Sequence, residues 1–263
     1  MKLGRLYGVG VGPGAPDLLT IRALRVIQNT AVLAIPRPND YSKSLAFRIV
    51  KDHLAAARSD QEKLFLTFPM SKDKDVLQPF WEAATLEVAI RLRQGLDVAF
   101  ITQGDPLIYS TFIYLMEAIR DVVEGVEVET IPAVTSIAAV PSAALTPLCD
   151  GMEKVAVLPA TYGLSELKKI LRDFDSVVLM KVGSVMPQVV EALQQEGLLS
   201  NAVYVERATT DQERVVHDLL SLKNDKCIYF SMVVVTKRDR AGVLVDTNKL
   251  AKVLSDKLAE TEI

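Results

Sequence analysis

The stretch between residues 8 and 16 is the part of the sequence whose composition most clearly points to chemistry. It holds four glycines and two prolines in nine residues, and it joins an apolar, strand-like run to a helix-like one. Glycines at a strand end let a ligand approach the backbone, because no Cβ stands in the way. The stretch therefore predicts a site for a nucleotide-like ligand; a simple strand-to-helix turn is the alternative.

The spacing of these glycines argues against a Rossmann dinucleotide site. That site follows G-x-G-x-x-G/A, with an acidic residue about 20 positions later that binds the ribose. Counted from Gly10, the last position is Ala15, which the pattern tolerates. However, Pro13 and Pro16 lack the backbone N–H that such a loop offers to a pyrophosphate. The next predicted strand, residues 31–35, ends in PRP without a carboxylate. We therefore expect a nucleoside-like ligand that has no pyrophosphate.

Composition narrows the class of protein. The chain has 263 residues, of which 49% are hydrophobic, and a formal net charge of −3. This length suits two modest domains or one large one, and the charge offers no basic face for nucleic acid. No apolar run approaches the roughly 18 residues of a membrane span. The N-terminus also lacks the basic segment followed by an apolar segment that is typical of a signal peptide. We expect a cytoplasmic protein that binds neither membrane nor nucleic acid.

The cysteines and histidines predict neither a metal site nor a catalytic triad. Cys149 and Cys227 are far apart in sequence and form no motif, which suits a reducing compartment. His53 and His217 are the only histidines, and neither has a neighbour at ligand spacing. We expect no bound metal, and we expect both histidines to be ordinary surface or partly buried residues.

Strand–loop–helix units repeat through the first half of the chain, which indicates parallel β-α units. Three unusual loops follow predicted strands: the glycine-rich loop, residues 103–106 and residues 133–136. Ligands of such sheets bind beyond the carboxyl ends of the strands, so the three loops should converge on one site. The remaining strands are expected at residues 31–35 and 64–68, and the helices at about 20–28, 44–54 and 75–94. Thr20 and Ser44 are expected to cap the first two helices, and Trp81 on the third is expected in the core.

The pattern lapses near Pro141 and Pro147, which predicts a hinge and divides the chain into domains of residues 1–146 and 147–263. A second α/β run follows the hinge. Its strands are expected at residues 155–158, 177–180, 202–205, 215–219 and 228–235. Helices are expected at residues 165–171 and 185–195, with a terminal amphipathic helix capped by Thr247.

These motifs resemble those of the tetrapyrrole (corrin/porphyrin) methylases over essentially the whole chain. The resemblance rests on VGVGPG at residues 9–14 followed by LLT at 18–20, on GDP at 104–106, and on PAVTS at 132–136. Three further segments resemble the branch that methylates carbon 20 of precorrin-2 or cobalt-factor II: FPM at 68–70 before a helix with WE at 81–82, GDPLIYSTF at 104–112, and LMKVG at 179–183.

The resemblance implies a class III methyltransferase fold of two α/β domains, a homodimer, and S-adenosylmethionine in the cleft between the domains. It implies that the product is a corrin precursor methylated on a meso carbon, in cobalamin biosynthesis. Many relatives have a second glycine where this chain has Gln103, and relatives outside this branch have a methionine before a glycine near Lys181 and Val182. Carried over position by position, the implied cofactor-binding residues are Pro13, Gln103, Gly104, Asp105, Ile108, Thr135, Ser136, Val182 and Ala208.

A polycarboxylate tetrapyrrole needs cations on a protein whose net charge is negative. The residues expected to supply them are Arg37, Lys43, Lys181 and Arg207, and Lys181 is the strongest because it directly follows an apolar strand. No residue is assigned to removal of the meso proton.

Three other functions remain open from the residues alone. A sister enzyme of the same family would methylate another ring position. A nicotinamide dehydrogenase would bind the dinucleotide tightly. A non-catalytic tetrapyrrole carrier would bind its ligand without S-adenosylmethionine and would not need three cofactor loops.

Overall fold

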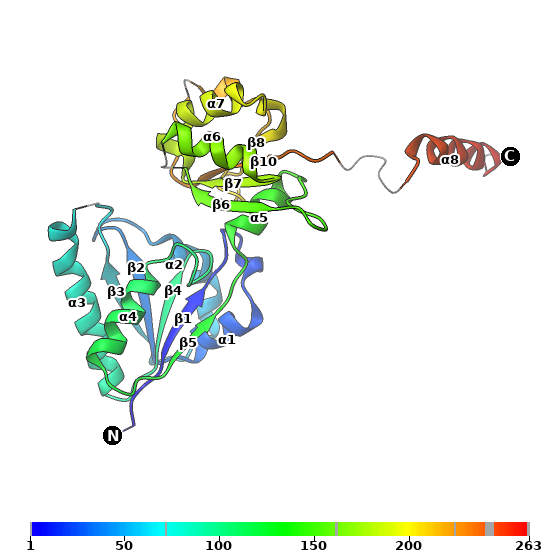
Figure 1. Cartoon of the computed structure of the whole chain (residues 1–263). Helices are drawn as coiled ribbons and strands as arrows, with labels where there is room; N and C mark the ends of the chain where they lie inside the picture. Colours follow the sequence, from blue (N-terminus) through cyan, green and yellow to red (C-terminus); the bar gives the residue numbers. More distant parts are fainter. Residues whose placement is uncertain (1, 72, 161–162, 224, 240–244, 262–263) are drawn as a thin grey trace.

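The structure is a computed structural model that describes residues 2–71, 73–160, 163–223, 225–239 and 245–261. It contains two five-stranded sheets, each flanked by helices, as Figure 1 shows. In the described residues no helix is both long and apolar enough to cross a membrane.

The first sheet is entirely parallel, as the repeated strand–loop–helix pattern predicts. Its strands follow the spatial order β3-β2-β4-β1-β5, so the glycine-rich loop leaves a strand near the middle of the sheet. In the register, Val9 lies beside Ile101 on one side and Ile131 on the other. The strands are β1 (Leu6–Gly10), β2 (Val32–Arg37), β3 (Glu62–Thr67), β4 (Val98–Thr102) and β5 (Val128–Ile131).

Helices cover both faces of this sheet and bury two separate apolar clusters. One cluster joins the sheet to α3 (Lys74–Arg93) and α4 (Phe112–Val122). The other joins it to α1 (Ile21–Asn29) and α2 (Leu45–Val50), and a 3-10 turn, η2 (Lys51–Ala56), follows α2. The sheet is thus covered on both faces, which explains why its central strands are apolar throughout.

Local signals in the first half are confirmed. The hydroxyl of Thr20 accepts a hydrogen bond from the Ala23 amide, and that of Ser44 accepts one from Phe47, so both residues cap helices. Gly95 ends α3 with φ +80°. Trp81 packs against the core, with its ring centroid 4.5 Å from that of Phe68.

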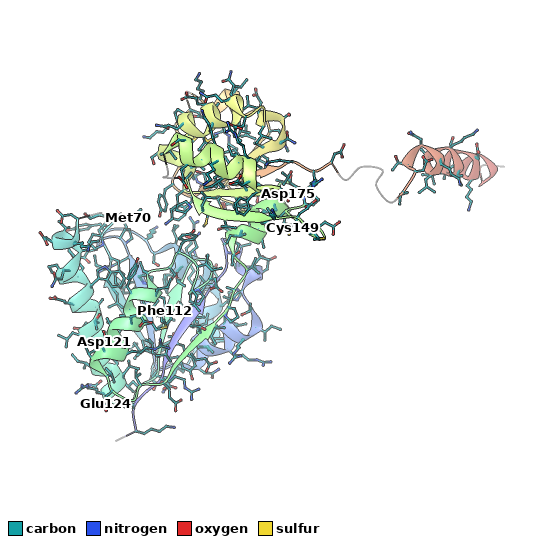
Figure 2. All side chains as sticks on the ribbon, in the orientation of Figure 1. Met70, Phe112, Asp121, Glu124, Cys149 and Asp175 are labelled. Atoms are coloured by element: carbon teal, nitrogen blue, oxygen red, sulfur yellow. The ribbon has the colours of Figure 1, made fainter. Side chains whose placement is uncertain are left out.

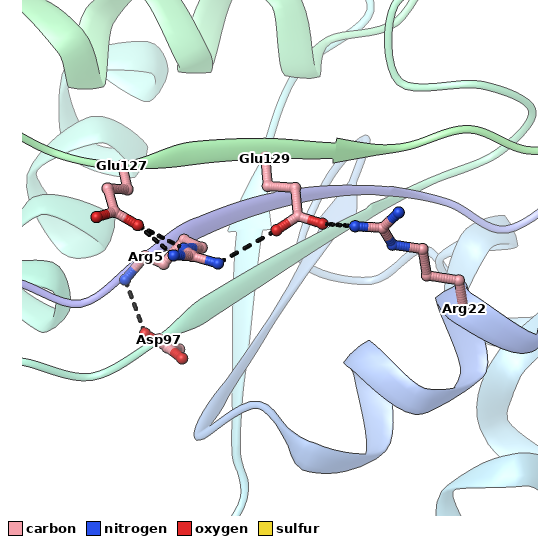
Figure 3. A network of polar contacts seen from close by, with 5 residues as sticks. All are labelled: Arg5, Arg22, Asp97, Glu127 and Glu129. Atoms are coloured by element: carbon pink, nitrogen blue, oxygen red, sulfur yellow. Dashed lines mark hydrogen bonds and ion pairs between the residues drawn. The ribbon is translucent and has the colours of Figure 1, made fainter.

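Charged residues hold the amino ends of the first sheet together (Figure 3). The Arg5 amide donates to Asp97 Oδ1 at 2.8 Å, and the Arg5 guanidinium bonds to Glu127 and Glu129. Arg22 of α1 also pairs with Glu129. This network joins the starts of β1, β4 and β5, at the opposite end of the strands from the three loops, and its role is structural.

The second sheet is mixed, with strand order β6-β7-β10-β8-β9. Only β6 and β7 are parallel neighbours; β10 runs antiparallel to both β7 and β8, and β9 antiparallel to β8. The strands are β6 (Val155–Pro159), β7 (Ser176–Met180), β8 (Ala202–Glu206), β9 (Arg214–Val216) and β10 (Ser231–Thr236).

Helices also cover both faces of the second sheet. One face packs against α6 (Leu164–Asp173) and α7 (Met186–Gln195). The other packs against α5 (Ser136–Ala143), which Figure 1 shows beneath the sheet. Because α5 follows β5 directly, the chain passes from the first sheet to the second through residues 132–135. The domain boundary after residue 146 stays a prediction.

Three expectations for the second half are wrong in detail. The strand expected at 215–219 ends at Val216, because Asp218 accepts a hydrogen bond from the Leu220 amide and starts the 3-10 turn η5 (Leu219–Leu222). The strand expected from residue 228 begins at Ser231, whose hydroxyl bonds to the Ile228 carbonyl and closes a turn. In α8 (Thr247–Thr261), the capping side chain is Asp246 rather than Thr247, since Asp246 Oδ1 accepts from the Lys249 amide at 3.0 Å.

Asp175, labelled in Figure 2, ties together strand ends of the second sheet. Its Oδ2 accepts from the Lys154 amide at 2.9 Å, and its carbonyl accepts from the Lys237 amide at 3.0 Å. The Lys154 amide and, less strongly, Arg238 hold the pKa of Asp175 below its ordinary value. A lowered folded-state pKa stabilises the fold at neutral pH, and this stabilisation disappears as the pH falls through that pKa.

We therefore expect Asp175→Asn to lower the melting temperature at pH 7 by roughly 2–4 °C. The difference from wild type should shrink as the pH falls through the lowered pKa of Asp175, because the wild-type carboxylate then loses its charge. Thermal unfolding across the pH range measures this. Asp173→Asn, at an exposed position two residues earlier, is the matched control. A loss of stability that does not change between pH 7 and the acid end of the range would contradict the role of the charge.

Candidate ligand-binding cleft

A cavity of about 350 Å³ lies between the two halves of the chain, within the range of about 300–1,000 Å³ typical of small-molecule sites. The loops after β1, β4 and β5 line it from one side, and the ends of β7 and β8 from the other. Ten predicted site residues meet there: Pro13, Gln103, Gly104, Asp105, Ile108, Thr135, Ser136, Lys181, Arg207 and Ala208.

The first two loops are joined through their backbones. The Gly104 amide donates to the Gly12 carbonyl at 2.8 Å, and the Gly12 amide donates back to Gly104 at 3.4 Å. The Gln103 side-chain amide donates to the Pro13 carbonyl at 2.8 Å. Gln103 therefore holds the glycine-rich loop in place as well as lining the cavity.

Asp105 joins the second loop to the third. One carboxylate oxygen accepts from the Leu107 amide at 2.9 Å, and the other accepts from the Ala133 amide at 3.1 Å. Among the described residues that line the cavity, Asp105 is the only acidic one. Each oxygen can accept a further hydrogen bond, so the side chain can position the loops and still bind a ligand hydroxyl.

The glycines of the first loop serve contacts within the protein. A Cβ on Gly10 would lie 2.6 Å from both the Ala133 Cβ and the Gly104 carbonyl oxygen. A Cβ on Gly14 would lie 2.6 Å from the Thr210 side chain. We expected a ligand to occupy the space left by the missing Cβ atoms; at these two positions the protein's own atoms occupy it.

The glycine-rich loop also contacts the second half of the chain. The Ala15 amide donates to Thr209 Oγ1 at 3.1 Å, while the Thr209 amide donates to Glu213 at 2.6 Å. Together with the close approach of Gly14 to the Thr210 side chain, this bond joins the glycine-rich loop to the turn after β8.

Backbone strain is concentrated at the cleft. In the described residues, five non-glycine residues have positive φ, and three of them line the cavity: Tyr109, Lys181 and Arg207, at +52°, +59° and +50°. A fourth, Thr209, makes the contact with Ala15. Such conformations cost about 1–3 kcal/mol each and cluster at functional sites. The strain therefore supports the view that the cleft binds a ligand.

Sequence reasoning missed several residues that line the cavity, above all Tyr109, Tyr229, Phe230 and Met70. Tyr229 and Phe230 reach the cleft because β10 is antiparallel, so its start lies beside the ends of β7 and β8. No pattern in the sequence indicates that direction. Tyr109 could have been found, since it follows the Asp105 loop directly, and Met70 follows β3 (Figure 2).

Three predicted site residues do not line the cavity. Val182 is fully buried in the core formed with α6 and α7. Arg37 lies over the Phe65 ring and bonds to Asp40. Lys43 is exposed after β2. Their roles in binding stay predictions.

A buried polar cluster supports the end of β8, behind the cleft. The Tyr204 hydroxyl donates to the Glu206 carboxylate at 2.5 Å, and burial together with this bond raises the pKa of Tyr204. Burial also raises the pKa of the nearby Cys227 thiol, so this cysteine has no character of a reactive thiolate. Within the described residues, no group of three or more His, Cys, Asp or Glu side chains could hold a metal ion.

Comparison with known proteins identifies the family to which this architecture corresponds. Residues 5–223 match the family described as Tetrapyrrole (Corrin/Porphyrin) Methylases. The cobalt-precorrin-2 C(20)-methyltransferase of Salmonella typhimurium is 34% identical over 236 residues, covering 89% of this chain and 97% of that protein. The precorrin-2 C(20)-methyltransferase of a Sinorhizobium species is 35% identical over 241 residues, covering 89% and 95%.

Solved structures share the fold. The cobalt precorrin-4 methyltransferase has a TM-score of 0.66 at 24% identity, covering 88% of this chain and 94% of that one. The uroporphyrin-III C-methyltransferase of Thermus thermophilus, complexed with S-adenosyl homocysteine, has a TM-score of 0.63 at 23% identity, covering 89% and 98%. At these identities the likeness concerns the fold alone.

The close packing of the loops around Gly10 predicts that an added side chain at this position lowers the stability of the protein. Gly10→Ala should destabilise the protein by about 1–3 kcal/mol, because the new methyl group meets backbone and Cβ atoms that cannot rotate away. Urea unfolding measures the change. Gly163→Ala is the control, since nothing lies within 4 Å of an added Cβ there. A Gly10→Ala variant as stable as Gly163→Ala would contradict the contact.

Proposed function

This chain belongs to the tetrapyrrole (corrin/porphyrin) methylases, and from that premise we propose that it is an S-adenosylmethionine-dependent C-methyltransferase acting on carbon 20 of precorrin-2 or its cobalt complex, in cobalamin biosynthesis. Relatives named for this reaction match most of the chain at 34% and 35% identity. The observation that carries the proposal is the convergence of three strand-end loops and the ends of β7 and β8 on one cavity.

The cleft fits a nucleoside that has no phosphate. Pro13 and Pro16 have no N–H, and the amides of Gly12 and Ala15 already donate within the protein. The loop therefore offers little to a pyrophosphate. Asp105 can accept hydrogen bonds from a ribose diol, and Thr135 and Ser136, which carry hydroxyls, also line the cavity.

We propose that different parts of the cavity hold different parts of the cofactor. Gln103, Gly104 and Asp105 would hold its ribose and methionine side, with Ile108 packed nearby. Ala208, which is buried and faces the glycine-rich loop, would lie near the adenine. Pro13 would lie beside the cofactor, between these two parts.

When bound, S-adenosylmethionine supplies a methyl group on a positively charged sulfur, and the charge disappears on transfer. The residues of the cleft contribute mainly orientation, which can be worth roughly 7–11 kcal/mol of the barrier. Apolar side chains exclude water and so protect a reduced tetrapyrrole; they include Met70, Ile108, Val140, Met180, Val205 and Phe230.

The charges of the cleft suit an acidic substrate. The cavity-lining cations, Lys181 and Arg207, both come from the second half, whereas the first half contributes the carboxylate of Asp105. Repulsion from Asp105 and attraction to the cations would turn the substrate carboxylates toward the second sheet. Both oxygens of Asp105 hold backbone amides, and we assign no residue to removal of the meso proton.

Other functions are weaker on specific grounds. A dehydrogenase function is weaker because β2 ends in Pro36 and Arg37 rather than in a carboxylate that could bind a ribose, and because the amides of Gly12 and Ala15 already donate within the protein. A tetrapyrrole carrier would not need the interlocked loops. A sister enzyme that methylates another ring carbon shares every feature of the cleft, and only the product distinguishes it.

Two further features stay predictions. The proposed homodimer is consistent with the exposed apolar side chains of Leu250, Val253, Leu254 and Leu258 on α8, since exposed apolar patches often mark protein interfaces. A cytoplasmic location is consistent with the supply of S-adenosylmethionine inside cells.

Incubation with methyl-labelled S-adenosylmethionine and precorrin-2, metal-free or loaded with cobalt, tests the reaction. We expect one labelled methyl group per tetrapyrrole, on the meso carbon 20, by NMR of the product. A label on another carbon would assign the chain to a sister reaction, and no transfer with either substrate would overturn the proposal.

Asp105→Ala should weaken binding of S-adenosylhomocysteine by about 10–150-fold, since hydrogen bonds to a charged group are worth about 1.5–3 kcal/mol. Calorimetry measures the affinity, and circular dichroism checks the fold. Asp121→Ala is the control, because Asp121 is exposed on α4. An Asp105→Ala variant that is folded and binds S-adenosylhomocysteine like wild type would show that Asp105 is not a cofactor ligand.

A further inference from the structure

Lys181 lies at the point where the two halves of the chain face each other across the cavity. Its Nζ is 5.5 Å from the ring centroid of Tyr109 and 5.7 Å from that of Tyr229. Tyr109 comes from the loop after β4, and Tyr229 from the segment before β10. An ammonium within about 6 Å of an aromatic ring is attracted to its face, so Lys181 links the two halves through two cation–π contacts.

The backbone fixes Lys181 in this place at a cost. Its φ is +59°, a region that favours glycine, and Tyr109 is also in this region at +52°. The Lys181 amide donates to the Ser231 carbonyl at 3.1 Å. Two residues later, an added Cβ on Gly183 would lie 2.3 Å from the Ile228 carbonyl oxygen. The turn that carries Lys181 is thus packed against the segment that carries Tyr229.

The ammonium has no carboxylate partner in the described part of the chain: none of the ion pairs there includes Lys181. Asp105, the cavity's acidic residue, bonds to the amides of Leu107 and Ala133 instead. A cation that is held in a strained conformation without a counter-charge is ready to receive one from a ligand.

The two rings also leave aromatic surface open beside this cation. Tyr109 is 49% exposed and Tyr229 is 46% exposed, and both line the cavity. A flat, conjugated macrocycle can pack on such rings while one of its acidic side chains meets the ammonium. The two tyrosines and the lysine therefore match a ligand that combines a partly conjugated ring with acidic side chains.

We propose that Lys181, Tyr109 and Tyr229 form a clamp that binds one carboxylate of the tetrapyrrole and so fixes which meso carbon faces the methyl donor. This inference rests on the proposed function. A nearly symmetric ring could bind in several orientations that differ by rotation in its own plane, and anchoring one substituent selects one of them. The clamp is thus a specificity-determining element rather than part of the methyl transfer.

Binding of uroporphyrin III, a porphyrin with eight carboxylates, tests the clamp without turnover. The full chain, saturated with S-adenosylhomocysteine, is titrated and the porphyrin fluorescence is followed. Lys181→Met should bind uroporphyrin about tenfold or more weakly than wild type, with less dependence on salt, because one charge-assisted bond is lost. Lys181→Arg should retain most of the affinity. Lys169→Met, at an exposed position on α6, is the matched control and should bind like wild type.

Variants that keep or remove the aromatic ring test the role of the two tyrosines. Tyr109→Phe and Tyr229→Phe keep the ring and should bind nearly like wild type, whereas Tyr109→Leu and Tyr229→Leu should weaken binding by about 2–5-fold, as expected for one cation–π contact at a partly exposed site. In turnover with precorrin-2, Lys181→Met should raise the KM for the tetrapyrrole, leave the KM for S-adenosylmethionine unchanged, and lower the share of methyl on carbon 20.

The outcomes separate this inference from the proposed function. If wild type binds uroporphyrin through Lys181 but transfers no methyl to precorrin-2, the clamp stands and the proposed reaction fails. If methyl transfer occurs but Lys181→Met binds uroporphyrin like the Lys169→Met control, the clamp is overturned. The clamp is also overturned if Lys181→Met weakens the binding of S-adenosylhomocysteine as much as the binding of uroporphyrin. It is likewise overturned if wild type does not bind uroporphyrin.

Discussion

The cleft depends on one set of main-chain contacts, by which three loops of the parallel sheet hold one another. The backbone pair between Gly12 and Gly104, and the carboxylate of Asp105 on the Ala133 amide, join loops from three different strands. Such contacts need small residues and a single carboxylate rather than a set of large, matched side chains. Tyr109 lines the cavity from the same loop as Gly104 and Asp105, so this interlock also helps to position Tyr109.

The same segment that completes the interlock also connects the two sheets. Residues 132–135 leave β5, receive the bond from Asp105, and lead into α5, which packs on the second sheet. Movement of the second half would therefore disturb the third loop directly. The bond from the Ala15 amide to Thr209 is a second link between the glycine-rich loop and the second half. The loops that line the cavity are thus bonded to both halves, which couples the shape of the cavity to the arrangement of the halves.

The first sheet could be predicted from sequence because its information is local: apolar strands, the caps at Thr20 and Ser44, and loops at strand ends. The second sheet depends on the antiparallel insertion of β10 between β7 and β8, which is a contact between distant segments. For that reason Tyr229 and Phe230 could not be found. Val182 lies outside the cavity for a different reason: Lys181 adopts a left-handed conformation, so Lys181 lines the cavity and Val182 lies in the core.

The glycine-rich loop shows that a motif can indicate a site although its glycines serve a different purpose from the one predicted. A missing Cβ permits close approach, and the sequence does not tell whether the approaching atoms belong to a ligand or to the protein. Here they belong to Ala133, Gly104 and Thr210. The loop's amides are likewise used internally, at Gly12 and Ala15, beside prolines that have none. A loop of this kind offers few hydrogen-bond donors to a phosphate. Selectivity among nucleoside ligands must therefore come from the groups around the loop, namely the carboxylate of Asp105 and the surface around Ala208.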